Sequence, residues 1–68
     1  MATGKIALSI SEDDEDVAYL ILPKHPGLGT AGAVRKQTRL LDLVKYAGPD
    51  VFLDFDMDGN LIGIEILA

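Results

Sequence analysis

Two apolar runs near the end of this 68-residue chain constrain its fold more than any other feature. They cover residues 51–55 and 61–67, they are rich in β-branched and aromatic residues, and Asp58-Gly59 lies between them. Asp-Gly between two apolar runs is one of the strongest short-range signals for a hairpin. We therefore predict an antiparallel hairpin that turns at Asp58-Gly59.

The apolar pattern also predicts how the two strands pair. A turn with an even number of loop residues places six apolar side chains on one face, in the pairs Phe55–Ile62, Leu53–Ile64 and Val51–Ile66. A three-residue bulged turn is the alternative; it sets Phe55 opposite Leu61 and Val51 opposite Glu65, which mixes polar and apolar residues on both faces. A slip of one residue inverts the faces. We expect the even register, with Glu65 facing away from Val51.

Two further strands are predicted before this hairpin. Residues 5–10 alternate between large apolar and other side chains, which is typical of a half-buried strand. Residues 17–22 form a continuous apolar run between acids and a proline, and so short a run suits a strand better than a helix. The consecutive acids 12–16 favour a solvated turn. We expect the two strands to form a hairpin across this acidic turn.

The middle of the chain is less regular. Residues 23–32 carry prolines and glycines and are predicted to be a loop. Residues 33–46 fit either a strand over 33–40 followed by a helical turn to Tyr46, which we expect, or a single helix. The predicted fold is mainly β: one domain over residues 1–68, with a small antiparallel sheet of about five strands built from hairpins and a short helical turn near 40–46.

Charge and composition exclude several classes of protein. Eleven acids and six bases give a net charge of −5, whereas phosphate binding needs a basic face, so no nucleic-acid partner is expected. The absence of cysteine excludes disulfide scaffolds and thiolate zinc sites. No apolar run reaches the ~18 residues of a membrane span. Acids interrupt the first apolar stretch, so we expect no signal peptide and a cytoplasmic location.

One stretch matches the calcium-loop pattern D-x-D-x-D-G-x5-E, with Asp54, Asp56, Asp58, Gly59 and Glu65 in the required places. Carboxylates at these positions are the ligands of a hard cation. An EF-hand needs a helix on each side, however, and here a Gly-Pro pair precedes the motif while only three residues follow it. We interpret the stretch as a hairpin turn, with metal ligation by the four acids as the alternative.

A second stretch matches the dinucleotide fingerprint G-x-G-x-x-G at Gly27, Gly29 and Gly32. The first glycine of that motif should follow its strand directly, whereas Pro-Lys-His-Pro intervenes here. The chain also lacks the remaining strands of a nucleotide crevice. We expect a flexible loop and no bound cofactor.

No catalytic set of side chains is indicated. His25, the single histidine, lies between a lysine and a proline and is expected to be exposed. Tyr19 and Tyr46 are interpreted as aromatic residues of the core or its rim. No combination of serine, histidine and acid is suggested, and a cysteine nucleophile is impossible. We therefore expect a protein that is not an enzyme.

Two stretches resemble a short prokaryotic family, domain of unknown function 2283. Residues 16–22 resemble its early strand motif, and residues 51–67 resemble its closing signature. In that signature an Asp-aromatic-Asp group leads to an Asp-Gly turn and a Gly-Ile-Glu-Ile-Leu strand. The resemblance implies a small, mainly β domain with no established activity. Some relatives are regarded as antitoxins encoded beside small toxin genes, which is an association and not a mechanism.

Two classes of function remain. The first is a small non-enzymatic binding or oligomerisation module, a homodimer or an antitoxin-like acidic partner of a small basic protein. A sheet with one apolar face must cover it with a second layer, and the short segment 40–46 is too small to do so, which predicts a homodimer. The second is a metal-binding protein or hydrolase that uses the acids of residues 54–65.

Overall fold

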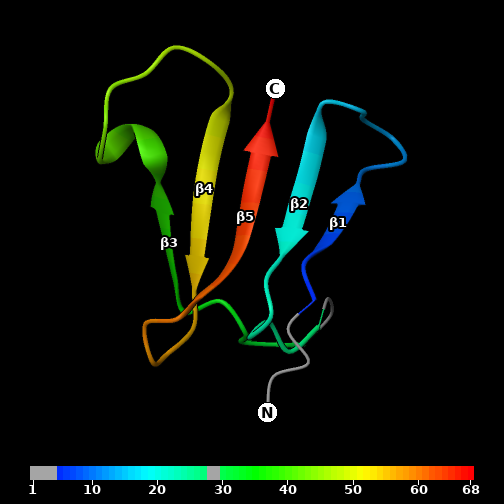
Figure 1. The fold of residues 1–68 in the computed structure, drawn as a ribbon, viewed down its shortest axis with the longest axis vertical. Helices are drawn as coiled ribbons and strands as arrows, with labels where there is room; N and C mark the ends of the chain where they lie inside the picture. The colour runs from blue at the N-terminus through cyan, green and yellow to red at the C-terminus, as the bar shows by residue number, and fades with distance from the viewer. Residues whose placement is uncertain (1–4, 28–29) are drawn as a thin grey trace.

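Five strands form one antiparallel sheet in the computed structural model, which describes residues 5–27 and 30–68 (Figure 1). The strands are β1 (Ala7–Ile10), β2 (Val17–Ile21), β3 (Lys36–Arg39), β4 (Asp50–Phe55) and β5 (Leu61–Leu67), and a single turn of 3-10 helix, η1 (Leu40–Asp42), follows β3. Their order across the sheet is β1-β2-β5-β4-β3. The mainly β fold, the sheet of five strands and the helical turn predicted from the sequence are confirmed.

Hairpins account for three of the four contacts between strands. β1 pairs with β2 across the acidic turn, β3 with β4, and β4 with β5. The long connection from β2 to β3 crosses one end of the sheet, so that β5 lies beside β2 (Figure 1). Main-chain hydrogen bonds hold both ends of this crossing: Leu22 donates to Ile62 at 3.0 Å and Arg35 donates to Phe55 at 2.8 Å.

The segment 33–46 is a strand and a helical turn, so the alternative of a single helix is wrong. β3 is shorter than expected, since it covers only Lys36–Arg39. In η1 the amides of Leu43 and Val44 both donate to the carbonyl of Leu40, at 2.9 and 3.0 Å. The helix ends there, and the Tyr46 hydroxyl donates to the Pro49 carbonyl at 3.0 Å across the bend that leads into β4.

The turn of the β4–β5 hairpin differs from the prediction. The Asp56 amide donates to the Asn60 carbonyl at 3.0 Å, and the Gly59 amide donates to the Asp56 carbonyl at 3.1 Å. Gly59 has a φ of +83°, the left-handed conformation that closes a three-residue loop of this type. The expected even-numbered loop is therefore wrong, and Phe55 lies opposite Leu61, as in the alternative register.

A bulge then restores the register that the apolar pattern predicts. Asp54 lies opposite Gly63 although Phe55 lies opposite Leu61, so Ile62 is an extra residue on β5. Beyond the bulge the expected pairs Leu53–Ile64 and Val51–Ile66 are present, and Glu65 lies opposite Phe52, away from Val51. Without the extra residue the odd turn would invert the faces of β5.

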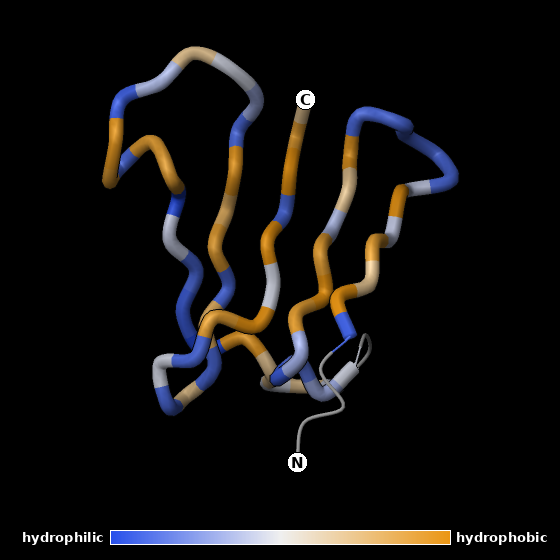
Figure 2. The backbone as a smooth tube through the Cα atoms, in the orientation of Figure 1, coloured by the Kyte–Doolittle hydropathy of each residue, from blue (hydrophilic) through white to orange (hydrophobic). Residues whose placement is uncertain are grey.

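The register divides the sheet into two unlike faces, because residues paired across strands share a face. One, here called the apolar face, carries Leu8, Ile10, Ala18, Leu20, Val51, Leu53, Phe55, Leu61, Ile64 and Ile66, with Thr38 and Lys36 on it at the β3 edge. The other, here called the mixed face, carries Ser9, Val17, Tyr19, Ile21, Gln37, Arg39, Asp50, Phe52, Asp54, Glu65 and Leu67. Hydropathy along the chain is mapped in Figure 2, where the acidic turn between β1 and β2 is the longest hydrophilic stretch.

The core within the described residues is small. Ile62 is fully buried, and the other buried residues are Asp54 and Gly63. Besides neighbouring strands, η1 packs against β4, but its segment does not close the apolar face. Leu43, just after η1, helps to line an open hollow of about 750 Å³ beside Thr38. The sheet is therefore essentially a single layer.

Candidate functional site

A buried carboxylate lies on the mixed face, near the end of β4 that leads into the β4–β5 turn. Asp54 on β4 is only 5% exposed. One of its oxygens accepts a hydrogen bond of 2.9 Å from the Tyr19 hydroxyl on β2, and the other accepts one of 2.8 Å from the Gln37 amide on β3. Burial of a carboxylate is costly unless it is hydrogen-bonded. The two donors meet this requirement and link three strands through one side chain.

Gly63 makes the contact between Tyr19 and Asp54 possible. β5 lies between β2 and β4, and Gly63 lies opposite both Ile21 and Asp54. A Cβ on Gly63 would overlap the hydroxyl of Tyr19. The tyrosine therefore reaches across β5 through the space that the missing side chain leaves, and this glycine is required by close approach rather than by its backbone angles.

The β2–β3 connection covers this part of the mixed face. The ring of His25 packs edge-on against Tyr19, with 5.8 Å between ring centroids, and its Nδ1 accepts a hydrogen bond of 2.9 Å from the Gly27 amide. His25 is half-buried, so the expectation that it is exposed is wrong, because the loop folds back over the sheet. A hollow of about 330 Å³ remains between Tyr19, His25 and the loop residues Thr30 and Val34.

The electrostatics of the cluster favour a fixed hydrogen bond over acid–base chemistry. Burial, together with the hydrogen bond and the negative charge of Asp54, raises the pKa of Tyr19 well above its ordinary value. The hydroxyl is thus a donor throughout the neutral range and a poor general base. Since both Asp54 oxygens already accept from the protein, the cluster ties strands together.

The structure separates the four acids of the calcium-loop pattern. Asp54 is buried on the mixed face, Glu65 is half-buried further along that face, and Asp58 is exposed at the hairpin tip. The Asp56 carboxylate accepts from the amides of Asp58 and Asn60 and from the Asn60 side chain, each at 2.9 Å. These bonds lower the pKa of Asp56. Within residues 5–27 and 30–68, no three acidic or histidine side chains gather closely enough to hold a metal ion.

The glycine motif lies in the β2–β3 connection, and Gly29 is outside the described residues. Gly27 and Gly32 have positive φ values of 119° and 72°. The connection leads into strand β3 and not into a helix, so its described part does not present the helix start that holds a pyrophosphate. This segment acts as a cover of the mixed face.

The acidic turn forms a second polar feature. Its acids, Glu12 to Asp16, are all exposed. The carboxylate of Asp14 accepts from the Asp16 amide at 3.0 Å, which shapes the turn locally. Far across the sheet, Arg39 donates to Asp50 at 2.7 Å in an exposed ion pair. The most acidic surface thus lies beside the β1 edge.

The comparisons with known proteins give a family and no relative of known function. No curated protein and no solved structure matches the chain. None of the helices in the described residues is long and apolar enough to cross a membrane. The family profile described as "Protein of unknown function (DUF2283)" matches residues 11–68, which include both motifs and all strands except β1. The chain belongs to the DUF2283 family.

Proposed function

We propose that this protein is a small non-enzymatic binding module that forms a homodimer through its apolar face. The observation that carries the proposal is the difference between the faces of a single-layer sheet. The mixed face has the β2–β3 connection over it, whereas the apolar face presents aliphatic side chains from four strands, which are exposed on β1 and, except for Leu61, half-buried on β2, β4 and β5. A sheet face of this kind is stable when a second layer covers it.

The size of the sheet suits this role. The molecule measures 36 × 28 Å along its two longer axes, and Figure 1 looks down the shortest axis onto the sheet. A standard interface buries about 800 Å² on each partner, which a face of these dimensions can provide. Two-fold dimers are the commonest oligomers, and one two-fold contact would cover both apolar faces together.

We also propose a small basic protein as a further partner, and the acidic turn supports it. Five consecutive exposed acids make the turn strongly negative, and such a patch speeds encounter with a positively charged surface. An antitoxin-like role, in which the module binds a small basic protein, is consistent with this charge. Co-purification from the native host at several salt concentrations tests it. No basic partner at any ionic strength would contradict it.

No contact among residues 5–27 and 30–68 favours the alternative of a hydrolase or metal-binding protein. Asp54 and Asp56 both accept hydrogen bonds from the chain itself. These carboxylates are engaged in holding strands and a turn.

The concentration dependence of thermal unfolding tests the homodimer. For a chain stabilised by self-association, Tm rises with protein concentration. Ile64→Lys places a charge at the centre of the apolar face, opposite Leu20 and Leu53, and we expect it to abolish this dependence. Glu65→Lys, one residue along on the mixed face, is the matched control and should keep it. A Tm independent of concentration in the parent protein, or equal effects of the two lysines, would contradict the proposal.

A further inference from the structure

The two edges of the sheet are protected to different degrees. β3 carries Lys36 and Arg39 at its ends, and charged residues on an edge strand discourage pairing with another chain. β1 is Ala-Leu-Ser-Ile, with no charge and no proline. Ile6, Leu8 and Ile10 on this edge are 65%, 60% and 54% exposed. An apolar, uncharged edge strand is a template for strand pairing.

The hydrogen-bonding groups of β1 point in the direction that such pairing needs. Ser11 lies in register with Val17, and its amide donates to the Val17 carbonyl at 3.0 Å. Residues alternate along an antiparallel ladder, so Ser9 also directs its main-chain groups toward β2. The amides and carbonyls of Leu8 and Ile10 therefore point away from the sheet, and so do those of Ile6 if the ladder continues.

The side-chain pattern of this edge is self-complementary. Large aliphatic residues occupy positions 6, 8 and 10, and Ala7 and Ser9 lie between them. If two copies pair antiparallel with Leu8 opposite Leu8, then Ile6 of each copy lies opposite Ile10 of the other. This register joins the outward-pointing main-chain groups and keeps the large aliphatic side chains on the apolar side. A shift by two residues would place Ile6 opposite Glu12.

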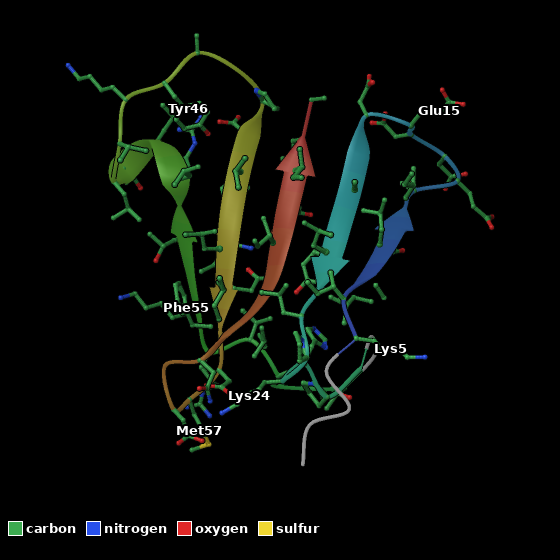
Figure 3. All side chains as sticks on the ribbon, in the orientation of Figure 1. Lys5, Glu15, Lys24, Tyr46, Phe55 and Met57 are labelled. Atoms are coloured by element: carbon green, nitrogen blue, oxygen red, sulfur yellow. The ribbon has the colours of Figure 1, made fainter. Side chains whose placement is uncertain are left out.

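Charge favours the same arrangement. Lys5 and Glu15 lie at opposite ends of the β1 edge (Figure 3). Antiparallel pairing about a two-fold axis brings Lys5 of each copy beside the start of the acidic turn of the other. It also places the two acidic turns at opposite ends of the contact, so that they do not repel each other at close range.

We infer that the homodimer is built by antiparallel pairing of β1 with β1 of a second copy, with Leu8 on the two-fold axis. The inference rests on the self-association proposed above and gives it a geometry. Two five-stranded sheets then form one sheet of ten strands. Strongly twisted sheets rarely exceed about ten strands without curling or dividing into packed layers. Both apolar faces then lie on the same side of this sheet, and curling of the sheet toward that side would fold them over each other.

Disulfide crosslinking of single-cysteine variants tests the pairing, since the chain has no cysteine of its own. In a hydrogen-bonded antiparallel pair the Cα atoms are about 5.5 Å apart, within the range that a disulfide bridges. We expect Leu8→Cys to form a covalent dimer under mild oxidation roughly ten times faster or more than Met57→Cys, which lies at the exposed hairpin tip. Ile10→Cys is the control on the same strand, because its two copies are about 14 Å apart at about 3.4 Å per residue.

A mixture of variants tests the register. Ile6→Cys mixed with Ile10→Cys should form the mixed dimer readily, although Ile10→Cys alone does not crosslink. If the parent protein sediments as a dimer but Leu8→Cys crosslinks no faster than Met57→Cys, the β1 contact is overturned while the proposed function stands. Crosslinking of Leu8→Cys with Ile10→Cys instead would overturn the register. A monomeric parent protein that does not crosslink would overturn both the β1 contact and the homodimer.

Discussion

The two faces of this single-layer sheet differ in what covers them. On the mixed face, Tyr19 and Gln37 satisfy the buried carboxylate of Asp54, and the β2–β3 connection lies over them with His25 against the tyrosine ring. On the apolar face, strands contribute aliphatic side chains, and the only nearby element of the described chain is the segment around η1. One face is closed by polar contacts within the chain, and the other is the face that we propose a second copy covers.

The comparison shows that the described part of this short chain covers one face of its sheet and not the other. Below about 70–80 residues a single core supplies little stability. In this chain the longest loop, the β2–β3 connection, covers the mixed face. Hydrogen bonds there fix the positions of β2, β3 and β4 relative to β5. In the proposed dimer the apolar face is a preformed surface, which lowers the ordering cost of binding.

The largest expected effect is on the mixed face, from Gly63→Val. The new side chain would displace Tyr19 from the space above β5 and break its bond to Asp54. We expect a loss of about 3 kcal/mol or more in the free energy of unfolding, because a buried charge network is broken and the site is overpacked. Urea unfolding measures it, with Gly63→Ala as the milder variant. An unchanged midpoint would contradict the crossing of Tyr19 over β5.

Tyr19→Phe tests the hydrogen bond without changing the packing. It removes one of the two donors to Asp54, and we expect a loss of about 1.5 kcal/mol, in the range for bonds to charged groups. In the double variant with Asp54→Asn the loss from Tyr19→Phe should be smaller, because the charge is gone. Equal losses in both backgrounds would show that the two residues are not coupled.

The pH dependence of stability gives an independent test of the same bond. Since folding raises the pKa of Tyr19 from 10.0, its contribution is fully present below pH 10 and is lost as the pH rises through the higher value of the folded state. Tyr19→Phe should therefore lose less stability than the parent protein between neutral pH and the alkaline range. Parallel curves in thermal unfolding would count against the raised pKa.

Gly59→Val addresses the turn that sets the register. A side chain at a φ of +83° costs roughly 1 kcal/mol or more, although nothing lies within 4 Å of the new Cβ. We expect a small drop in the urea midpoint with the fold retained. Gly59→Asn is the control, since asparagine tolerates this conformation better and should lose less. Loss of folding with Gly59→Asn would contradict a purely conformational role.

Asp56→Asn should have the smallest effect. The folded state lowers the pKa of Asp56, so its contribution is present above the ordinary value of 3.8 and is lost as the pH falls through the lower value. The variant retains an oxygen for the amides of Asp58 and Asn60, and we expect it to be slightly less stable than the parent protein at neutral pH. The difference should shrink in acid, as measured by thermal unfolding.

Strand positions followed from the sequence, but the contacts between distant side chains did not. Alternation and the Asp-Gly signal predicted both hairpins, because those patterns are local. The predicted turn length was wrong because Asp56 and Asn60 close a three-residue loop. The bulge at Ile62 compensates for the odd loop, so the apolar pattern of the strands is the same as it would be with an even loop.

The Tyr19–Asp54–Gln37 cluster could not be predicted, because it depends on which strands become neighbours. One signal was present: Gly63 stands among isoleucines in a strand, where glycine often marks a close approach of other groups. Knowing what approaches requires the order β2-β5-β4, which only the structure provides. His25 was missed for the same reason, since the loop's return over Tyr19 is a long-range contact.

Sedimentation equilibrium of the parent protein at micromolar concentration tests the central claim most directly, because the claim is that the apolar face is covered by a second copy. We predict a folded species of twice the 7.3 kDa chain mass, which Ile64→Lys converts to a monomer. A parent protein that sediments at 7.3 kDa and still unfolds cooperatively would contradict the account.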